Sequence, residues 1–394
     1  MNLSGNTFGS VTVGDNARAH LGNIYNRHIS EPTPKRAPVL LVPFRKDKNF
    51  VGREEVLDNI EECLSVDGYH NRVALTGLGG VGKSQIAIQY SYRHHAKHPE
   101  DWVFWVYAGS RERFIESYRN IAIQTGIVKD DDANVNYLRV VKNWLCDRNK
   151  GRWLLVIDSA DDNELFVADG GGEARLNLRQ SIPESEHGAV LITSRNITGP
   201  DLAGDIDDVL RIGPFEESTA LQLMRMKVPS FAEDIDGKQL VSTLEYIPLA
   251  LTQAAAYINR NQVSVQYYLQ RFQQEEQQQV ELLGKDWNDL RRDATVSNPV
   301  LTTWRMTYDQ LVQSHRLAAQ LLARMALLER QCIPEILVLR MRNDAPDNDR
   351  VEAMGTLLQY GLCTQLDAEQ GYTMHRLVQV CTKAWLRKAG VARR

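Results

Sequence analysis

Short apolar runs recur through the first half of the chain, at residues 72–76, 101–107, 152–158 and 188–195. Each has the length of a strand buried on both faces. The segments between them carry apolar residues at helical spacing, most clearly at 114–125 and 137–147. Strands that alternate with helices in this way predict an α/β fold with a doubly wound parallel sheet over residues 50–211.

Helical patterns replace the strands beyond residue 212. We expect helices at 216–226 and over 237–257, where Pro248 fits the first turn of a new helix because proline is costly inside one. We assign 212–290 to a helical domain. Residues 291–394 predict several helices and then a hairpin at 361–374, an order typical of a winged-helix domain.

The N-terminal stretch, residues 1–28, has a different pattern. Val11 and Val13 alternate with Thr12, and apolar and polar residues alternate again after the turn at 14–16. Two short strands cannot bury a face alone, whereas stacked copies could. A polar tail is the alternative. Residues 29–49, rich in Pro, Lys and Arg, predict a stiff exposed linker.

Composition limits the classes of function. The chain has 394 residues and a formal net charge of −4, which argues against a dominant role in nucleic-acid binding. Its five cysteines are scattered and read as reduced thiols. No apolar run approaches the roughly 20 residues that span a bilayer, so we expect no membrane span and a cytoplasmic location.

The segment Gly77–Ser84, GLGGVGKS, follows a predicted strand and opens a predicted helix. This pattern and context are those of a phosphate-binding loop. Backbone N–H groups and the helix N-terminus would bind the phosphates of ADP or ATP, Lys83 would reach the β- and γ-phosphates, and Ser84 would ligate Mg²⁺. The expected nucleotide-binding residues here are Gly77, Gly79, Gly80, Val81, Gly82, Lys83, Ser84 and Gln85.

Two later strands end in polar residues that suit the same site. Asp158 ends an apolar run, as in a Walker B motif, and is expected to hold Mg²⁺ through water. Arg195 follows Thr193 and Ser194, a strand end that resembles the sensor motif of NB-ARC proteins. The resemblance implies that Arg195 reads the γ-phosphate, a task that suits a planar guanidinium. Ser159 stands where many related sites carry a second acid, and Asp161 and Asp162 are the next acids. We therefore expect at most slow hydrolysis.

Together these motifs resemble the NB-ARC domains of NLR-like receptors in the signal-transduction ATPase (STAND) class. The segment Phe50–Glu55 resembles the hhGRE motif, which places Val51 and Arg53 beside adenine. Pro248 stands where the GLPL motif has its proline, with Tyr246-Ile247 in place of Gly-Leu. Met374-His375 resembles the MHD motif, with Arg376 in place of Asp. The resemblance implies that Pro248 packs on the nucleotide and that His375 contacts the β-phosphate of ADP.

The resemblance further implies an ADP-bound off state and an ATP-bound on state that self-oligomerises. Residues 6–25 resemble the amyloid-forming repeat of HET-s-type fungal prion proteins. This second resemblance implies a cell-death effector with a matching motif as the partner. NB-ARC receptors usually continue into a sensor repeat array; we find no repeat of roughly 20–50 residues and expect such an array to lie outside this sequence or to be lost.

Two other functions remain open from the residues alone. One is a P-loop ATPase that acts on a substrate, although the chain shows no second catalytic cluster. The other is a winged-helix regulator of transcription, although residues 300–375 carry no basic stripe. The activating ligand, the effector and the oligomer number do not follow from the sequence.

Overall fold

A computed structural model describes residues 38–66, 71–128, 135–162, 165–166, 178–195, 209–274, 307–309, 311–330, 333–339, 346–366 and 371–388. The predicted signalling motif at 1–28 and the first part of the predicted linker lie outside these ranges. So do parts of the predicted helical and winged-helix domains, including 275–306.

A parallel sheet forms the first half of the described chain, as predicted, and it has six strands there in the order β1-β3-β4-β5-β2-β6. The two short outer strands, Leu40–Leu41 and Val209–Arg211, were not predicted. The strands are β1 (Leu40–Leu41), β2 (Asn71–Thr76), β3 (Trp102–Tyr107), β4 (Trp153–Asp158), β5 (Gly188–Ser194) and β6 (Val209–Arg211). Because β5 lies between β2 and β4, the ends of these three neighbouring strands meet at one edge of the sheet. That edge carries the predicted phosphate loop, Asp158 and Arg195.

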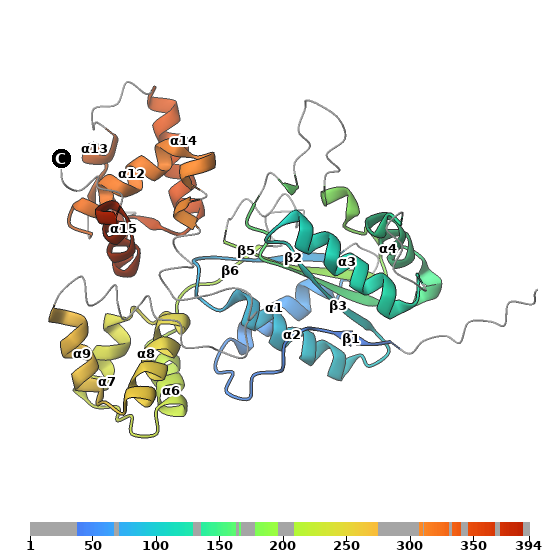
Figure 1. The fold of residues 1–394 in the computed structure, drawn as a ribbon, viewed down its shortest axis with the longest axis horizontal. Coiled ribbons are helices and arrows are strands. Elements are labelled where there is room, and N and C mark those ends of the chain that lie inside the picture. The colour runs from blue at the N-terminus through green and yellow to red at the C-terminus, as the bar shows by residue number, and fades with distance from the viewer. Residues whose placement is uncertain are drawn as a thin grey trace, which may run out of the picture. The chain divides into compact units, whose positions relative to one another are not determined.

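Helices cover both faces of this sheet because its strands alternate their side chains between two cores. Val73 and Val156 pack with α1 (Glu54–Leu64) and α2 (Lys83–Lys97). Ala74 and Ile157 pack with α3 (Arg111–Thr125) and α4 (Tyr137–Leu145) on the other face (Figure 1). Burial on both faces explains why the strands read as unbroken apolar runs. Short 3₁₀ turns occur at η1 (Arg148–Lys150) and η3 (Leu178–Ser181).

The described part of the predicted linker belongs to the fold, which corrects the expectation of an exposed spacer. Leu40 and Leu41 pair with β3 as an edge strand. The ring of Phe44 packs edge-on against Trp105, with centroids 5.5 Å apart. The Tyr92 hydroxyl donates to the carbonyl of Phe44 at 2.7 Å. Prolines suit such an edge strand, and the sequence pattern did not reveal it because only two residues pair.

In the described stretch 209–274, the sheet is followed by four helices: α6 (Glu217–Lys227), α7 (Ile235–Thr243), α8 (Pro248–Asn261) and α9 (Val265–Gln274). Pro248 begins α8, as predicted, because the first helical residue needs no intrahelical N–H partner. We call residues 215–274 the helical part. Among the described residues, no helix is long and apolar enough to cross a bilayer.

The remaining described residues, 307–388, are called the C-terminal part. The predicted hairpin is present, formed by β8 (Cys363–Leu366) and β9 (Gly371–Met374) in antiparallel pairing, with β7 (Ile333–Pro334) on the other side of β9. Its helices include α12 (Arg316–Leu327), α13 (Glu335–Leu339), α14 (Asp347–Gln359) and α15 (Arg376–Lys388), and residues 307–309 and 311–314 are helical as well. Leu322, Met325 and Leu377 are buried in the core that these elements share.

Candidate nucleotide-binding site

The loop between β2 and α2 has the geometry of an anion cradle. Gly77, Gly80 and Gly82 have φ values of 142°, 93° and 101°, a region that favours glycine. A Cβ on Gly77 would stand 2.3 Å from the Ile212 carbonyl oxygen, so no larger residue fits there. A Cβ on Gly82 would meet no described atom within 4 Å. The open space lies at the N-terminus of a 15-residue helix, where backbone N–H groups bind anions.

Lys83 is buried inside this cradle. Its ammonium donates to the carbonyl oxygens of Gly77 and Leu78 at 2.8 and 3.2 Å. Burial lowers the pKa of Lys83 to about 8, although the nearby carboxylates of Asp161 and Asp158 act in the opposite direction. An anion in the cradle would stabilise the charged form. The loop and Lys83 therefore fit nucleotide phosphates.

Ser84 and Asp158 meet as the Mg²⁺ prediction requires. The Ser84 hydroxyl donates to Oδ1 of Asp158 at 2.7 Å, and the Thr193 hydroxyl donates to the same oxygen at 2.7 Å. Burial raises the pKa of Asp158, against these two hydrogen bonds, which lower it. A hydroxyl and a carboxylate beside a phosphate cradle are oxygen ligands that suit Mg²⁺, and Ser84 and Asp158 are the residues that would hold it.

Arg195 lies at the same edge but is engaged with protein groups. Its Nε donates to Oδ2 of Asp161 at 2.7 Å, and its backbone N–H donates to Oδ1 at 2.6 Å. Its Nη1 donates to the hydroxyl of Thr307 in the C-terminal part at 2.8 Å. Burial alone would raise the pKa of Asp161, but Arg195 and Lys83 together bring it below the usual range. The sequence showed Asp161 only as an acid displaced from the expected position, and gave no sign of this pairing.

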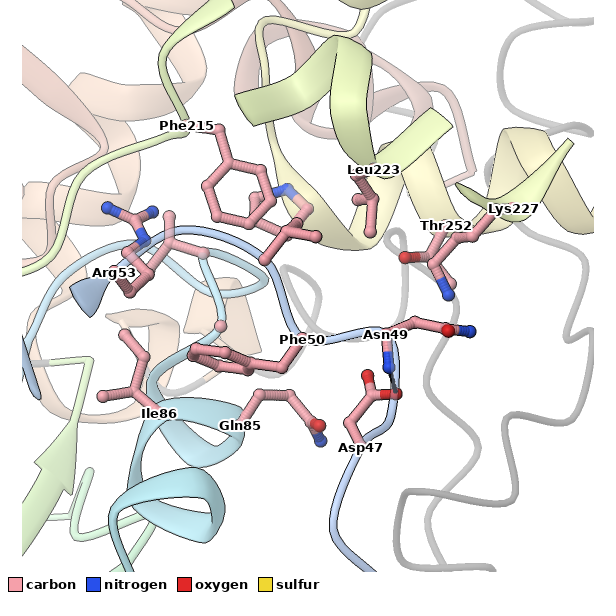
Figure 2. A pocket seen from close by; sticks show the side chains of 14 residues that line it. Asp47, Asn49, Phe50, Arg53, Gln85, Ile86, Phe215, Leu223, Lys227 and Thr252 are labelled. Atoms are coloured by element: carbon pink, nitrogen blue, oxygen red, sulfur yellow. Dashed lines mark hydrogen bonds between the residues drawn. The ribbon is translucent and has the colours of Figure 1, made fainter. Parts of the chain in front are cut away.

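A pocket beside the loop contains six of the predicted nucleotide-binding residues: Val51, Arg53, Val81, Gly82, Gln85 and Pro248. Its volume, including the part open to solvent, is about 550 Å³. In Figure 2, Phe215 and Leu223 lie on one side of the space and Phe50, Ile86 and Gln85 on the other. Apolar walls with a few polar groups are typical of nucleobase pockets. Phe215 and Leu223 were missed, because nothing in their local sequence separates them from core residues, whereas Phe50 begins the hhGRE-like segment that was expected beside adenine.

Arg53 supports this pocket through its side chain. Its guanidinium lies over the ring of Phe215, 4.8 Å from the centroid, and Nη2 donates to the carbonyl of Gly213 at 2.6 Å. Pro248 enters the pocket at the start of α8. The next residue, Leu249, donates its N–H to the carbonyl of Gly80 at 3.1 Å. The helical part is therefore bonded directly to the phosphate loop.

His375 is not among the residues that line this pocket. Its Nδ1 lies against Oε2 of Glu245, at the end of α7. The backbone N–H of Arg376 donates to the same carboxylate, and the Arg376 guanidinium lies 5.8 Å from the ring centroid of Phe272 in α9. The predicted contact of His375 with a β-phosphate remains a prediction.

Comparison with known proteins agrees with this geometry. Residues 53–233 match the model of the NB-ARC domain family. A protein of the fungus Hyaloscypha variabilis, described as nucleotide-binding leucine-rich repeat (NLR)-like, is 34% identical over 374 residues, which cover 91% of this chain and 37% of that protein. A protein of Arabidopsis thaliana named for disease resistance is 23% identical over 183 residues, 44% of this chain and 14% of its own length. The chain thus spans well under half the length of these relatives.

Among solved structures, the Walker-type ATPase PABY2304 of Pyrococcus abyssi is similar in fold. Its TM-score is 0.56 at 15% identity, over 87% of this chain and 98% of that one. This likeness supports the P-loop NTPase fold. The match of residues 53–233 to the NB-ARC domain model covers the phosphate cradle and most of the pocket beside it.

Proposed function

We propose that this protein is a nucleotide-dependent signalling switch, with ADP in the off state and ATP in the on state. The observation that carries the proposal is the composition of the pocket. One wall comes from the phosphate loop and the segment 47–53, and the other from Phe215, Leu223 and Pro248 of the helical part. A ligand that contacts both parts of the chain binds with an affinity that depends on how the two parts are arranged.

Arg195 gives this switch a means to distinguish the two nucleotides. In the structure it binds Asp161 and reaches Thr307 in the C-terminal part. Arg195 would exchange these partners for the γ-phosphate of ATP, because a guanidinium forms strong paired hydrogen bonds with phosphate oxygens. Loss of the Thr307 contact would then loosen the C-terminal part. With Mg²⁺ bound by Ser84 and Asp158, the site would also neutralise phosphate charge.

The remaining parts of the proposal follow the family resemblance. Residues 212–290 and 291–394 act as the helical and winged-helix domains that close over ADP. The ATP state self-oligomerises in the cytoplasm and brings the N-terminal motifs together, which then template the matching motif of a cell-death effector. The similarity to an NLR-like protein and the NB-ARC match support this class of function.

The decisive experiment identifies the nucleotide that stays bound during purification and measures the affinities for ADP and ATP. We expect retained ADP, and loss of tight binding in Lys83→Ala. The matched control is Lys97→Ala, at the other end of α2, where an exposed ion pair with Glu61 contributes little. Phe215→Ala should weaken both nucleotides equally, because both carry the same base. Equal melting-temperature shifts with nucleotide in wild type and Lys83→Ala would refute the site.

The second candidate is a P-loop ATPase that turns over on a substrate. Asp161 is the observation in its favour: the charge of this acid is near enough to raise the pKa of Lys83, although Asp161 does not occupy the position of the expected second acid. A substrate-acting enzyme would release ADP quickly and turn over many times. Multiple rapid turnovers without retained ADP would favour this candidate over the switch.

A further inference from the structure

Glu245, just beyond the end of α7, accepts hydrogen bonds from two groups of the C-terminal part and has a third, ion-pair contact there with His375. The N–H of Arg376 lies 2.9 Å from Oε2 and 3.2 Å from Oε1. Nη1 of Arg330 lies 3.0 Å from Oε1, and Nδ1 of His375 lies against Oε2. The carboxylate is mostly buried, as is the His375 side chain, each 18% exposed. An ionised carboxylate only accepts hydrogen bonds, so it suits a site where the donors of Arg330 and Arg376 converge beside the His375 imidazole.

The backbone conformation at Glu245 indicates that glutamate is present for its side chain and not for the turn. Glu245 and Tyr246 have φ values of 50° and 57°, in the left-handed region where glycine is favoured and most side chains are disfavoured. If the position served only to turn the chain before Pro248, glycine would serve better. Glutamate stands there, and its carboxylate meets residues 85 and 131 positions away in the sequence.

The same carboxylate caps α15. The first N–H groups of a helix have no partner within the helix, and Ser, Thr, Asp or Asn normally precede it to provide one. Here α15 begins at Arg376 and is preceded by His375. Glu245 supplies the missing acceptor from a distant segment, and its negative charge suits the positive end of the helix.

We propose that Glu245 is a positioning residue that sets the His375 ring and the start of α15, and so holds the C-terminal part on the helical part in the ADP-favouring state. The proposal rests on the proposed function for its nucleotide preference, but not for the contact itself. Glu245 acts through His375: the Nδ1 contact fixes the orientation of the imidazole, as carboxylates do for functional histidines elsewhere. The Arg376 guanidinium over Phe272 supports the same junction.

The test uses the full chain and two glycine variants of the same turn. Glu245→Gly removes the carboxylate and relieves the left-handed backbone, whereas Tyr246→Gly relieves the backbone and removes a partly buried ring but leaves the carboxylate in place. We expect Glu245→Gly to lower the affinity for ADP about tenfold more than that for ATP. Hydrogen exchange of the first-turn amides of α15, without nucleotide, should become at least tenfold faster. Tyr246→Gly should leave both quantities within about twofold of wild type.

A double variant tests whether Glu245 acts through His375. The double variant Glu245→Gly, His375→Ala should show the same ADP-over-ATP preference as His375→Ala alone. Both substitutions remove the same contact between Glu245 and His375, so the second one adds no further effect. Additive losses would overturn the positioning role. Unchanged exchange in Glu245→Gly, or equal effects in Tyr246→Gly, would overturn the proposal altogether. If the wild-type chain binds no nucleotide, the proposed function fails, while the exchange comparison still decides whether Glu245 holds α15.

Discussion

Asp161 and Arg195 form a buried ion pair beside the phosphate loop, with Arg195 Nε 2.7 Å from Asp161 Oδ2 and each side chain 13% exposed. Lys83 lies close enough to influence the pKa of Asp161. A cation that would bind a γ-phosphate is therefore already neutralised by a protein carboxylate. ATP must compete with that carboxylate for Arg195.

Asp161→Asn should destabilise the nucleotide-free chain and favour ATP. Removing one partner of a buried pair leaves a desolvated charge, at a cost of about 3–5 kcal/mol. The γ-phosphate can replace the missing carboxylate, so ATP should restore more stability than ADP. Melting temperatures with each nucleotide measure this. Asp162→Asn serves as the control, and equal rescue by ADP and ATP would contradict the competition.

The pKa of Lys83 predicts that a rise in pH increases the free energy of unfolding but decreases the affinity for ADP. The folded-state pKa of Lys83, about 8, lies below the 10.5 of an ordinary lysine. Between these values the unfolded chain binds the extra proton, so the free energy of unfolding should rise with pH, by up to about 3 kcal/mol from this group. Bound phosphates favour the charged lysine, so ADP affinity should fall above pH 8, at most about tenfold per pH unit.

Calorimetry in buffers of different ionisation enthalpy would detect the coupled proton. Lys83→Met retains the aliphatic volume and removes the titrating group. In this variant both trends should disappear together with tight binding. A wild-type ADP affinity that stays constant from pH 7.5 to pH 9.5 would contradict the assignment of Lys83 to the phosphates.

Ser159→Asp should accelerate ATP hydrolysis, which we expect to be slow in the wild-type chain. The wild-type rate should lie well below the roughly 10 s⁻¹ typical of enzymes, because a serine hydroxyl cannot activate water as a carboxylate can. Ser159 has a φ of 63°, which Asp and Asn tolerate better than most residues. Ser159→Asn is therefore a matched control without the charge. Single-turnover measurements should show faster hydrolysis in Ser159→Asp only.

A peptide of residues 1–28 should form fibrils with a cross-β spacing near ~4.7 Å. Alone, so short a unit buries too little apolar surface to offset backbone ordering, at about 1–2 kcal/mol per residue. Val13→Asp should prevent fibrils by placing charge inside the stack, and Thr12→Lys should matter less because it faces outward. Fibre diffraction and a dye-binding assay distinguish them. A peptide that stays monomeric at high concentration would refute a signalling role.

Local pattern alone determined the four central strands of the sheet and the phosphate loop. Strands such as Trp153–Asp158 are buried on both faces, so every position before the terminal Asp158 is apolar and the signal needs no knowledge of neighbours. The loop is equally local: its glycines, Lys83 and Ser84 are consecutive, and Pro248 marks a helix start by its own covalent chemistry. The contact between Ser84 and Asp158 was also predictable, because the carboxyl ends of neighbouring parallel strands lie at the same edge of a sheet.

Only the tertiary structure decided which partners the charged residues have. Arg195 pairs with Asp161 and Thr307, and Glu245 gathers Arg330, His375 and Arg376 across 85 to 131 positions. A charged side chain carries no periodicity that names its partner, because its contact depends on how separate elements pack. The sequence pattern missed the two-residue strand β1 and the place of Phe215 in the pocket wall for the same reason. Both depend on contacts between residues far apart in the sequence, which local spacing does not encode.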